Sequence, residues 1–197
     1  MLSQFLSEPS LDESGSWSVT TEKDCQLWCH GRDLRDLSGA HGNPATLFPG
    51  LRNDIPTLLI SECCLCYLET DTAAEVIKWF TERVPEIGII IYEPTNPGDA
   101  FGRTMIENLA SRKISMPTLF AYSRPKDQVT RLQAAGFEEA RYLTIDQVWD
   151  AWVSDQEKER VNGCEGLDEV EEWKLLASHY ILAWGWRGPE FQPWTEV

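Results

Sequence analysis

Two short apolar runs stand out in the hydrophobic pattern of the chain, at residues 57–61 and 87–93. Each run is too short for a helix and is bounded by turn residues, which is typical of a strand buried on both faces. Further strands are predicted at residues 26–30, 140–143 and 181–186. The pattern thus predicts short strands with longer segments between them.

The segments between these strands place apolar residues at helical spacing. Asp71 or Thr72 can cap the first helix, and Gly136 suits the left-handed position after a later one. Helices are predicted at residues 71–83, 100–112, 123–136, 145–153 and 168–180. Because strands alternate with helices, we expect an α/β fold with right-handed crossovers and a largely parallel sheet.

The start of the chain lacks this alternation. Residues 1–23 are rich in serine, glutamate and aspartate without a sustained period, so we expect a flexible N-terminal arm. The arm has no basic start and no sustained apolar stretch, unlike a secretory leader. One domain is expected to follow, over residues 24–197.

Charge narrows the class of partner. Seventeen Lys and Arg residues stand against 32 Asp and Glu, which gives a formal net charge of -15. Such a chain repels a nucleic-acid backbone or an anionic membrane surface unless it carries a basic patch, and none is visible. The apolar runs are also far shorter than the roughly 18 residues of a membrane span. We therefore expect a cytoplasmic protein that binds neither nucleic acid nor a membrane.

The six cysteines do not form an obvious framework. Cys63, Cys64 and Cys66 are too close together for an ordinary set of disulfides, which favours a reducing compartment. The run Cys25, Cys29, His30 matches no standard zinc spacing. Buried, hydrophobe-like cysteines are therefore favoured over a metal site.

Candidate chemistry comes from the residues that follow the predicted strands. Ligands of α/β sheets bind beyond the carboxyl ends of the strands, where Asp33, Glu62 and Glu93 are expected. Carboxylates at this place suit a ligand with hydroxyl groups, an amino group or positive charge. The alternative, that they only cap helices or face solvent, stays open.

Common catalytic motifs are missing. The sequence has no G-x-G-x-x-G, no P-loop and no G-x-S-x-G elbow. Its histidines, His30, His41 and His179, are scattered and have no evident nucleophile beside them. No catalytic residue is therefore assigned.

Several short motifs follow one another in a characteristic order. They are residues 33–37 (DLRDL), 56–63 (PTLLISEC), 67 (Y), 92–93 (YE), 98–99 (GD), 101–102 (FG), 105–109 (MIENL), 179–180 (HY) and 184 (W). In order and spacing the chain resembles the leucine carboxyl methyltransferases, which modify the C-terminal leucine of type 2A protein phosphatase catalytic subunits. The resemblance extends over most of residues 26–187.

This resemblance implies a class I methyltransferase sheet of Rossmann-like type and S-adenosylmethionine as the cofactor. In the family the DLRDL segment contacts the adenine end, which points to Asp33 and Leu34, and the glutamate after the central strand, here Glu62, lies beside the methionine end. Tyr67, Tyr92 and Glu93 are the implied substrate-binding residues. The implied partner is the C-terminal tail of a type 2A phosphatase catalytic subunit.

The implied reaction needs little acid–base chemistry. A leucine carboxylate, with a pKa near roughly 3.5, is already ionised at neutral pH and can attack a sulfonium methyl group directly. Catalysis then depends mainly on alignment of the reacting atoms and exclusion of water.

The chain departs from the family at its start, because the glycine-rich cofactor loop that normally precedes the DLRDL segment is missing. We therefore expect the C-terminal part of a methyltransferase domain without its first strands, weak or inactive alone, in which residues 57–61 form an open edge. The alternative is a non-catalytic interaction module derived from this fold. Its binding surface would use six tryptophans near the acidic stretch 157–172, namely Trp149, Trp152, Trp173, Trp184, Trp186 and Trp194.

Overall fold

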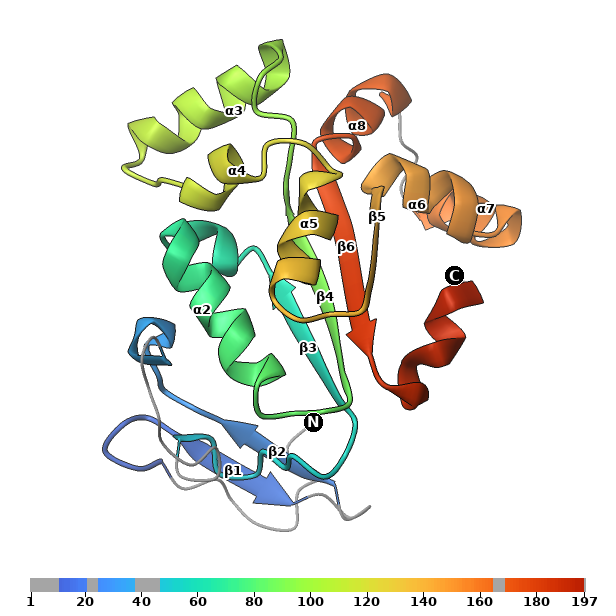
Figure 1. Ribbon diagram of the computed structural model, residues 1–197. Coiled ribbons are helices and arrows are strands. Elements are labelled where there is room, and N and C mark those ends of the chain that lie inside the picture. Colours follow the sequence, from blue (N-terminus) through green and yellow to red (C-terminus); the bar gives the residue numbers. More distant parts are fainter. Residues whose placement is uncertain (1–10, 21–24, 38–46, 165–168, 197) are drawn as a thin grey trace.

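The computed structural model describes residues 11–20, 25–37, 47–164 and 169–196 (Figure 1). The strands are β1 (Trp17–Thr20), β2 (Gln26–Cys29), β3 (Thr57–Glu62), β4 (Ile87–Pro94), β5 (Glu139–Thr144) and β6 (Tyr180–Arg187). The helices are α2 (Thr70–Thr81), α3 (Ala100–Ser111), α4 (Pro117–Ala121), α5 (Asp127–Ala134), α6 (Ile145–Trp152), α7 (Asp155–Cys164) and α8 (Val170–Ala177). Three 3-10 helices are η2 (Leu34–Leu37), η3 (Leu65–Tyr67) and η4 (Pro189–Glu196). None of the described helices is long and apolar enough to cross a bilayer.

The main sheet has the strand order β3-β4-β6-β5 (Figure 1). β3 and β4 are parallel, with Leu58 opposite Gly88, whereas β6 is antiparallel to both β4 and β5. The predicted α/β class is confirmed, and β3, β4 and β5 run in one direction. The expectation of a largely parallel sheet is wrong. β6 lies between β4 and β5 and is antiparallel to both, so β3–β4 is the one parallel pair of this sheet.

Most predicted helices are present, with shifted ends. α3 and α6 match residues 100–112 and 145–153, and each has a clear start: Asp99 accepts from the Gly102 amide at 2.7 Å, and Thr144 forms a capping box with Gln147. α2 begins at Thr70, before the predicted caps. The helix expected at 123–136 is the shorter α5, and of the helix expected at 168–180 the structure describes α8.

Two short helices were not predicted. α4 has five residues, too few to show a helical period. α7 is rich in charged residues and buries no side chain, so it lacks the apolar stripe on which such a prediction depends.

β1 and β2 pair antiparallel and form a separate two-stranded sheet. The strand predicted at residues 26–30 is confirmed as β2, but it does not join the main sheet. The expected flexible arm, residues 1–23, contains β1, and its residues 1–10 and 21–23 lie outside the described residues.

The core lies between the main sheet and the helices α2 and α5, on what we call the helix-covered face (Figure 1). Its fully buried side chains include Ile77, Ile87, Ile89, Ile91, Leu132 and Ile181. Complete burial of such a side chain stabilises the fold by about 1.5–3 kcal/mol. This face therefore holds the sheet and its two helices together.

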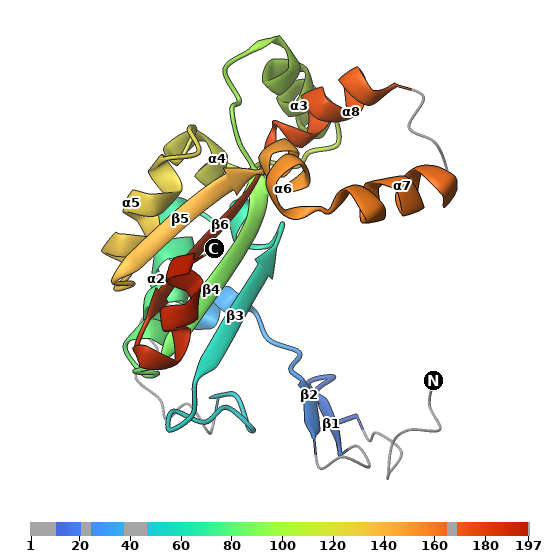
Figure 2. The same ribbon diagram turned by 90° about the vertical axis from the view of Figure 1, so that its right-hand side faces the viewer.

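The opposite face of the sheet is covered over β4 and β6 by η4 (Figure 2). Phe191 packs there with Trp184 and Trp186, both nearly fully buried. A Cβ atom at Gly88 would lie 2.7 Å from the Phe191 ring, so the close approach of η4 depends on glycine at this position. The tryptophans of β6 are thus core residues here.

β3 is covered on one face only. Leu59 packs against the core, while on the opposite face Leu58 is 44% and Ile60 71% exposed. The prediction of a strand buried on both faces at residues 57–61 is therefore wrong. The sequence is apolar on both faces, but the described residues supply a cover for just one of them.

Candidate functional site

The candidate site lies at the carboxyl ends of β3 and β4. Glu62, the last residue of β3, is exposed and lies opposite Tyr92 in the register. Next to it Cys63 has a φ of 42°, a left-handed conformation that costs a non-glycine residue about 1–2 kcal/mol, and its amide donates to the Tyr92 carbonyl at 2.8 Å. This sharp turn leads into η3 and brings Tyr67 to the same end of the sheet.

Three tyrosines gather at this end. The rings of Tyr92 and Tyr180 stack with centroids 5.3 Å apart, and Tyr67 is 48% exposed. Burial raises the pKa of all three phenols, so each keeps its proton at neutral pH and can donate a hydrogen bond. Tyr180 was not predicted as a site residue. The antiparallel direction of β6 brings its first residue here, and the only signal in the sequence is the motif at residues 179–180.

Glu93 does not lie on the exposed rim. It is 1% exposed, on the helix-covered face, and accepts from Arg131 of α5 at 2.8 Å. Burial raises the pKa of its carboxyl group, while the Arg131 charge opposes this effect. Neighbouring residues of a strand point to opposite faces of the sheet. Because Tyr92 points to the accessible face, Glu93 points to the helix-covered one, and the prediction that both lie on the rim is wrong.

Asp33 and Leu34 differ in their surroundings. Asp33 is exposed and accepts from the Arg35 guanidinium at 2.9 Å, which lowers the pKa of its carboxyl group to about 2. Leu34 is half-buried and lines an apolar cavity of about 210 Å³ between η2, α2 and β3. Ser61 and Cys64, on either side of the turn at Glu62, line the same cavity. The fold therefore brings the DLRDL segment and the end of β3 together.

The cysteines nearby are held as neutral thiols. Burial raises the pKa of Cys63 and Cys64, and that of Cys66 to about 12, so their thiols stay protonated at neutral pH. The six cysteines all lie within the described ranges, and no disulfide joins them. Within the described ranges, no group of three His, Cys, Asp or Glu side chains is arranged to hold a metal ion.

His179 has a structural position. It is 2% exposed, its Nε2 lies 2.9 Å from the Asp99 carboxylate and its Nδ1 lies 2.8 Å from the Leu175 carbonyl. The bonds from the Gly102 amide and from His179 hold the pKa of Asp99 below its usual range. Because both ring nitrogens are engaged, His179 connects α3 with β6 and has no nitrogen left for a substrate.

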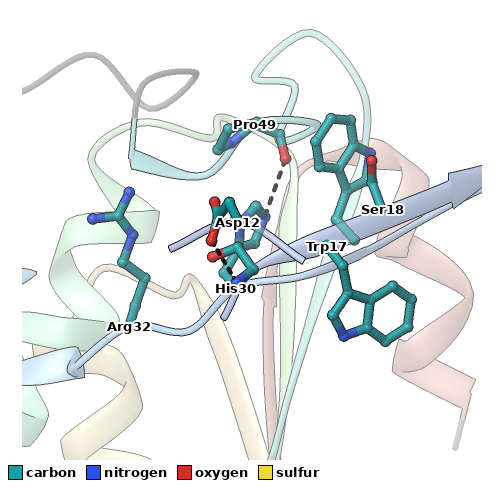
Figure 3. Close-up of a pocket in the computed structure, with 8 residues that line it drawn as sticks. Asp12, Trp17, Ser18, His30, Arg32 and Pro49 are labelled. Carbon is teal, nitrogen blue, oxygen red and sulfur yellow. Dashed lines mark hydrogen bonds between the residues drawn. The ribbon is translucent and has the colours of Figure 1, made fainter. Parts of the chain in front are cut away.

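A second hollow, of about 200 Å³, lies in the region of the β1–β2 hairpin (Figure 3). The His30 ring stacks on Trp28, and its Nε2 lies 3.1 Å from the Pro49 carbonyl. Asp12, Arg32 and Trp17 are among the other lining residues (Figure 3). None of the site residues predicted from the sequence lies in this hollow.

The strand order, with one antiparallel strand entering between two that run in one direction, defines the class I S-adenosylmethionine-dependent methyltransferase fold. The solved structure of a protein assigned as a methyltransferase, from Thermobifida fusca, superposes with a TM-score of 0.50 at 11% sequence identity. The match covers 80% of this chain and 53% of that protein. No family model matches the chain.

Sequence relatives then specify the family. The chain is 43% identical over 186 residues to leucine carboxyl methyltransferase 1 of Emericella nidulans, covering 85% of this chain and 49% of that protein. It is 47% identical over 166 residues to the Aspergillus fumigatus protein of the same name, covering 78% and 42%. The chain belongs to the leucine carboxyl methyltransferase family.

Two further facts concern the extent of the match to this family. The chain spans about half the length of these curated relatives, which fits the expectation of a C-terminal part. It is also 34% identical over 158 residues to tRNA wybutosine-synthesizing protein 4 of Rattus norvegicus, covering 80% of this chain and 23% of that protein. The family resemblance predicted from the motifs is confirmed.

Proposed function

We propose that this chain forms the part of a leucine carboxyl methyltransferase that holds the adenine end of S-adenosylmethionine and faces the substrate. The complete enzyme methylates the C-terminal leucine carboxylate of a type 2A protein phosphatase catalytic subunit. The observation that carries the proposal is the apolar cavity beside Leu34, directly under the turn at Glu62, in a chain 43% identical to a leucine carboxyl methyltransferase.

The residues of this cavity fit one end of the cofactor. Small-molecule sites commonly enclose about 300–1,000 Å³, so a cavity of about 210 Å³ suits a ring rather than a whole cofactor. Leu34, Leu59 and Phe80 supply apolar surface for the ring. The exposed Asp33, next to Leu34 in the sequence, is the proposed acceptor for an amino group. When bound, S-adenosylmethionine supplies a methyl group on a positively charged sulfur.

Glu62 and the tyrosines have separate tasks in this proposal. The exposed Glu62 carboxylate favours positive charge at the end of β3. The protonated phenols of Tyr67 and Tyr92 can donate to the carboxylate of a peptide and orient its oxygen. Glu93 supports the same end from inside the sheet through Arg131.

The proposed reaction uses no general base from this chain. A leucine carboxylate is ionised at neutral pH, so one of its oxygens can form the new bond to the methyl carbon without giving up a proton. The chain then contributes by holding that oxygen in line and keeping water away. The cysteine thiols are protonated, and both ring nitrogens of His179 lie within hydrogen-bond distance of other groups. Both facts agree with a reaction that uses no base from this chain.

The proposed setting is the cytoplasm, where thiols are kept reduced, because Cys63, Cys64 and Cys66 are too close together for an ordinary set of disulfides and no disulfide joins them. The chain alone is expected to be weak or inactive, since it lacks a glycine-rich loop for the rest of the cofactor. The part of the family's sequence that this chain does not match is therefore added before transfer is measured.

Calorimetric titration with S-adenosylmethionine tests the proposal. The chain alone should bind weakly and should not methylate a peptide that ends in leucine, and the complementing half of a family member should restore transfer. In the restored enzyme Glu62→Gln should weaken cofactor binding roughly tenfold, as expected for loss of a charged partner. Glu138→Gln is the matched control, because Glu138 is exposed at the opposite end of the sheet.

Two results would contradict the proposal. Equal cofactor affinity of wild type and Glu62→Gln would remove Glu62 from the site. Absence of any cofactor binding, alone and after complementation, would favour the non-catalytic interaction module instead.

A further inference from the structure

A buried ion pair lies behind the candidate site, at the end of β4. Glu93 is 1% and Arg131 3% exposed, and their side chains are joined at 2.8 Å. The same guanidinium donates to the buried Gln128 side chain at 3.2 Å and lies over the Tyr122 ring, 4.9 Å from its centroid. The pair thus joins β4 to α5 inside the fold, where salt screens its charges little.

The stability of the fold does not account for this pair. Glu93 Oε1 and the Arg131 Nε and Nη2 groups are buried and have no hydrogen-bond partner among the described residues. Removal of two charges from water carries a large cost, which only excellent geometry and complete hydrogen bonding offset. Replacement of such a pair by apolar residues of similar volume is often neutral or stabilising. A role other than stability is therefore expected for Glu93 and Arg131.

The turn at residues 63–67 lies beside this pair. The Cys63 amide donates to the carbonyl of Tyr92, the neighbour of Glu93, at 2.8 Å. Burial raises the pKa of the three cysteines in the turn, and the Glu93 charge raises each of them further. Burial also raises the pKa of Glu93, and its ion pair and the Cys66 backbone amide oppose this effect. The Glu93 carboxylate therefore lies on the inner side of the turn.

This turn connects the two parts of the candidate site. Cys64 and Leu65 line the cavity beside Leu34. Tyr67, at the end of the turn, is 48% exposed. Cys63 holds a left-handed φ of 42°, a conformation that persists in a non-glycine residue only where the surroundings fix it. The placement of Tyr67 relative to the cavity therefore depends on contacts that the turn receives from other elements.

We infer that Glu93 and Arg131 are positioning residues that fix the turn at residues 63–67. The Glu93 carboxylate supports the turn from inside, and Arg131, held by Gln128, keeps that carboxylate in place. Neither residue touches cofactor or substrate; both act through the turn, which carries a wall of the cavity at one end and Tyr67 at the other. Their effect on methyl transfer rests on the proposed function, whereas their hold on the turn does not.

Hydrogen exchange of the full chain tests this hold on the turn. The double variant Glu93→Leu/Arg131→Met replaces the pair by apolar side chains, so its midpoint of urea unfolding should be no lower than that of wild type. The amides of Cys63 and Tyr67 should nevertheless exchange about tenfold faster or more, because the turn opens locally. Glu93→Gln/Arg131→Gln, which removes both charges with little change in volume, should give the same local opening. The matched control Glu157→Leu/Arg160→Met removes an exposed pair of the same residue types on α7 and should leave this exchange unchanged.

Methyl transfer tests the consequence for the site. In the enzyme restored with the part of the family's sequence that this chain does not match, either β4–α5 double variant should lower kcat for a peptide ending in leucine about tenfold. The Kd for S-adenosylmethionine should change by less than about threefold, because the Glu93–Arg131 pair does not line the cavity. A pair with only a structural role would leave kcat of the folded enzyme unchanged.

Three outcomes would overturn the inference. They are unchanged exchange in the turn of both double variants, exchange that rises equally along β3 and β4, and an unchanged kcat despite an opened turn. The second result would make the pair a support of the whole sheet. Absence of transfer by the restored wild-type enzyme would instead contradict the proposed function, and the exchange measurements would still decide whether the pair holds the turn.

Discussion

The two faces of the main sheet are built from similar residues and have different surroundings. Ile89 and Ile91 of β4 face α2 and α5 and are at most 1% exposed, whereas Ile60 of β3 faces the other way and is 71% exposed. The isoleucines are alike, so composition does not distinguish the faces. The difference shows that burial in this protein depends on which elements lie over each face. The helix-covered face has a buried core, whereas the opposite face is exposed at β3.

The largest effect should follow from Arg131→Met on the helix-covered face. Arg131 and Glu93 are at most 3% exposed, and removal of one partner leaves the other charge buried without compensation. The free energy of unfolding should fall by about 3–5 kcal/mol in chemical denaturation. Arg124→Met, which breaks the exposed pair with Asp127, is the control and should have a much smaller effect. Equal losses would mean that this face is not a closed interior.

The same variant predicts a pH dependence. Burial raises the pKa of Glu93 in the folded protein above its ordinary value near 4.5, and loss of the Arg131 charge removes the main opposing effect. The folded state then holds its proton to higher pH than the unfolded state. The contribution of Glu93 to the stability of Arg131→Met should therefore be fully present below about pH 4.5 and be lost as pH rises through the raised pKa. Glu93→Gln in the same background should abolish this dependence.

A matched pair of isoleucines measures the difference between the faces directly. Ile89→Ala should lower the free energy of unfolding by about 2–5 kcal/mol, because it leaves a cavity in the core. Ile60→Ala should change it by less than about 0.5 kcal/mol, since the side chain is exposed. Thermal or urea unfolding of the two variants decides the matter. A large loss in Ile60→Ala would show that its face is covered in solution.

Asp99→Asn should have a smaller effect on the free energy of unfolding. Asp99 lies at the start of α3, outside both faces of the sheet. The Asp99 carboxylate caps α3 and accepts from His179. These contacts lower its pKa in the folded protein. The stabilisation is therefore present above the ordinary aspartate pKa and is lost as pH falls through the lowered pKa. The variant should therefore lose stability at neutral pH and lose less than wild type as pH falls below about 4. Parallel pH-dependent curves would contradict this role for Asp99.

The finest comparison needs no substitution. In a dilute, monomeric sample the amides of Leu59 and Ser61 should exchange more slowly than those of Leu58 and Ile60, because only the former face β4. Residue-resolved hydrogen exchange by NMR tests this alternation. Equally slow exchange along the whole strand would mean that another element covers the edge of β3.

Much of the fold could be predicted because local signals agree with it. Apolar residues at helical spacing locate α3 and α6, and the apolar run of β4 is buried as its composition suggests. The run of β3 misled the prediction, because apolar residues on two faces do not reveal whether anything covers them. The direction of β6 was also hidden, since strand direction depends on tertiary contacts and not on local sequence.

The candidate site shows the same limit. Leu34 was implied by its motif and does line the cavity, and Tyr67 and Tyr92 lie at the expected end of the sheet. Glu93 was expected on the accessible rim beside Tyr92, but it points to the helix-covered face. The sequence alone does not show which residues of a strand face the helices. Tyr180 was missed, because only an antiparallel β6 brings it beside Tyr92.

The position of β6 also affects how the protein can be made. β6 is the last strand in the sequence, yet it separates β4 from β5, which have no pairing with each other in the sheet order. During synthesis the ribosome releases β3, β4, α2 and β5 first, and the strand that joins them emerges last. Until then the edge of β4 that pairs with β6 stays open, and an open apolar edge of this kind favours association with other chains.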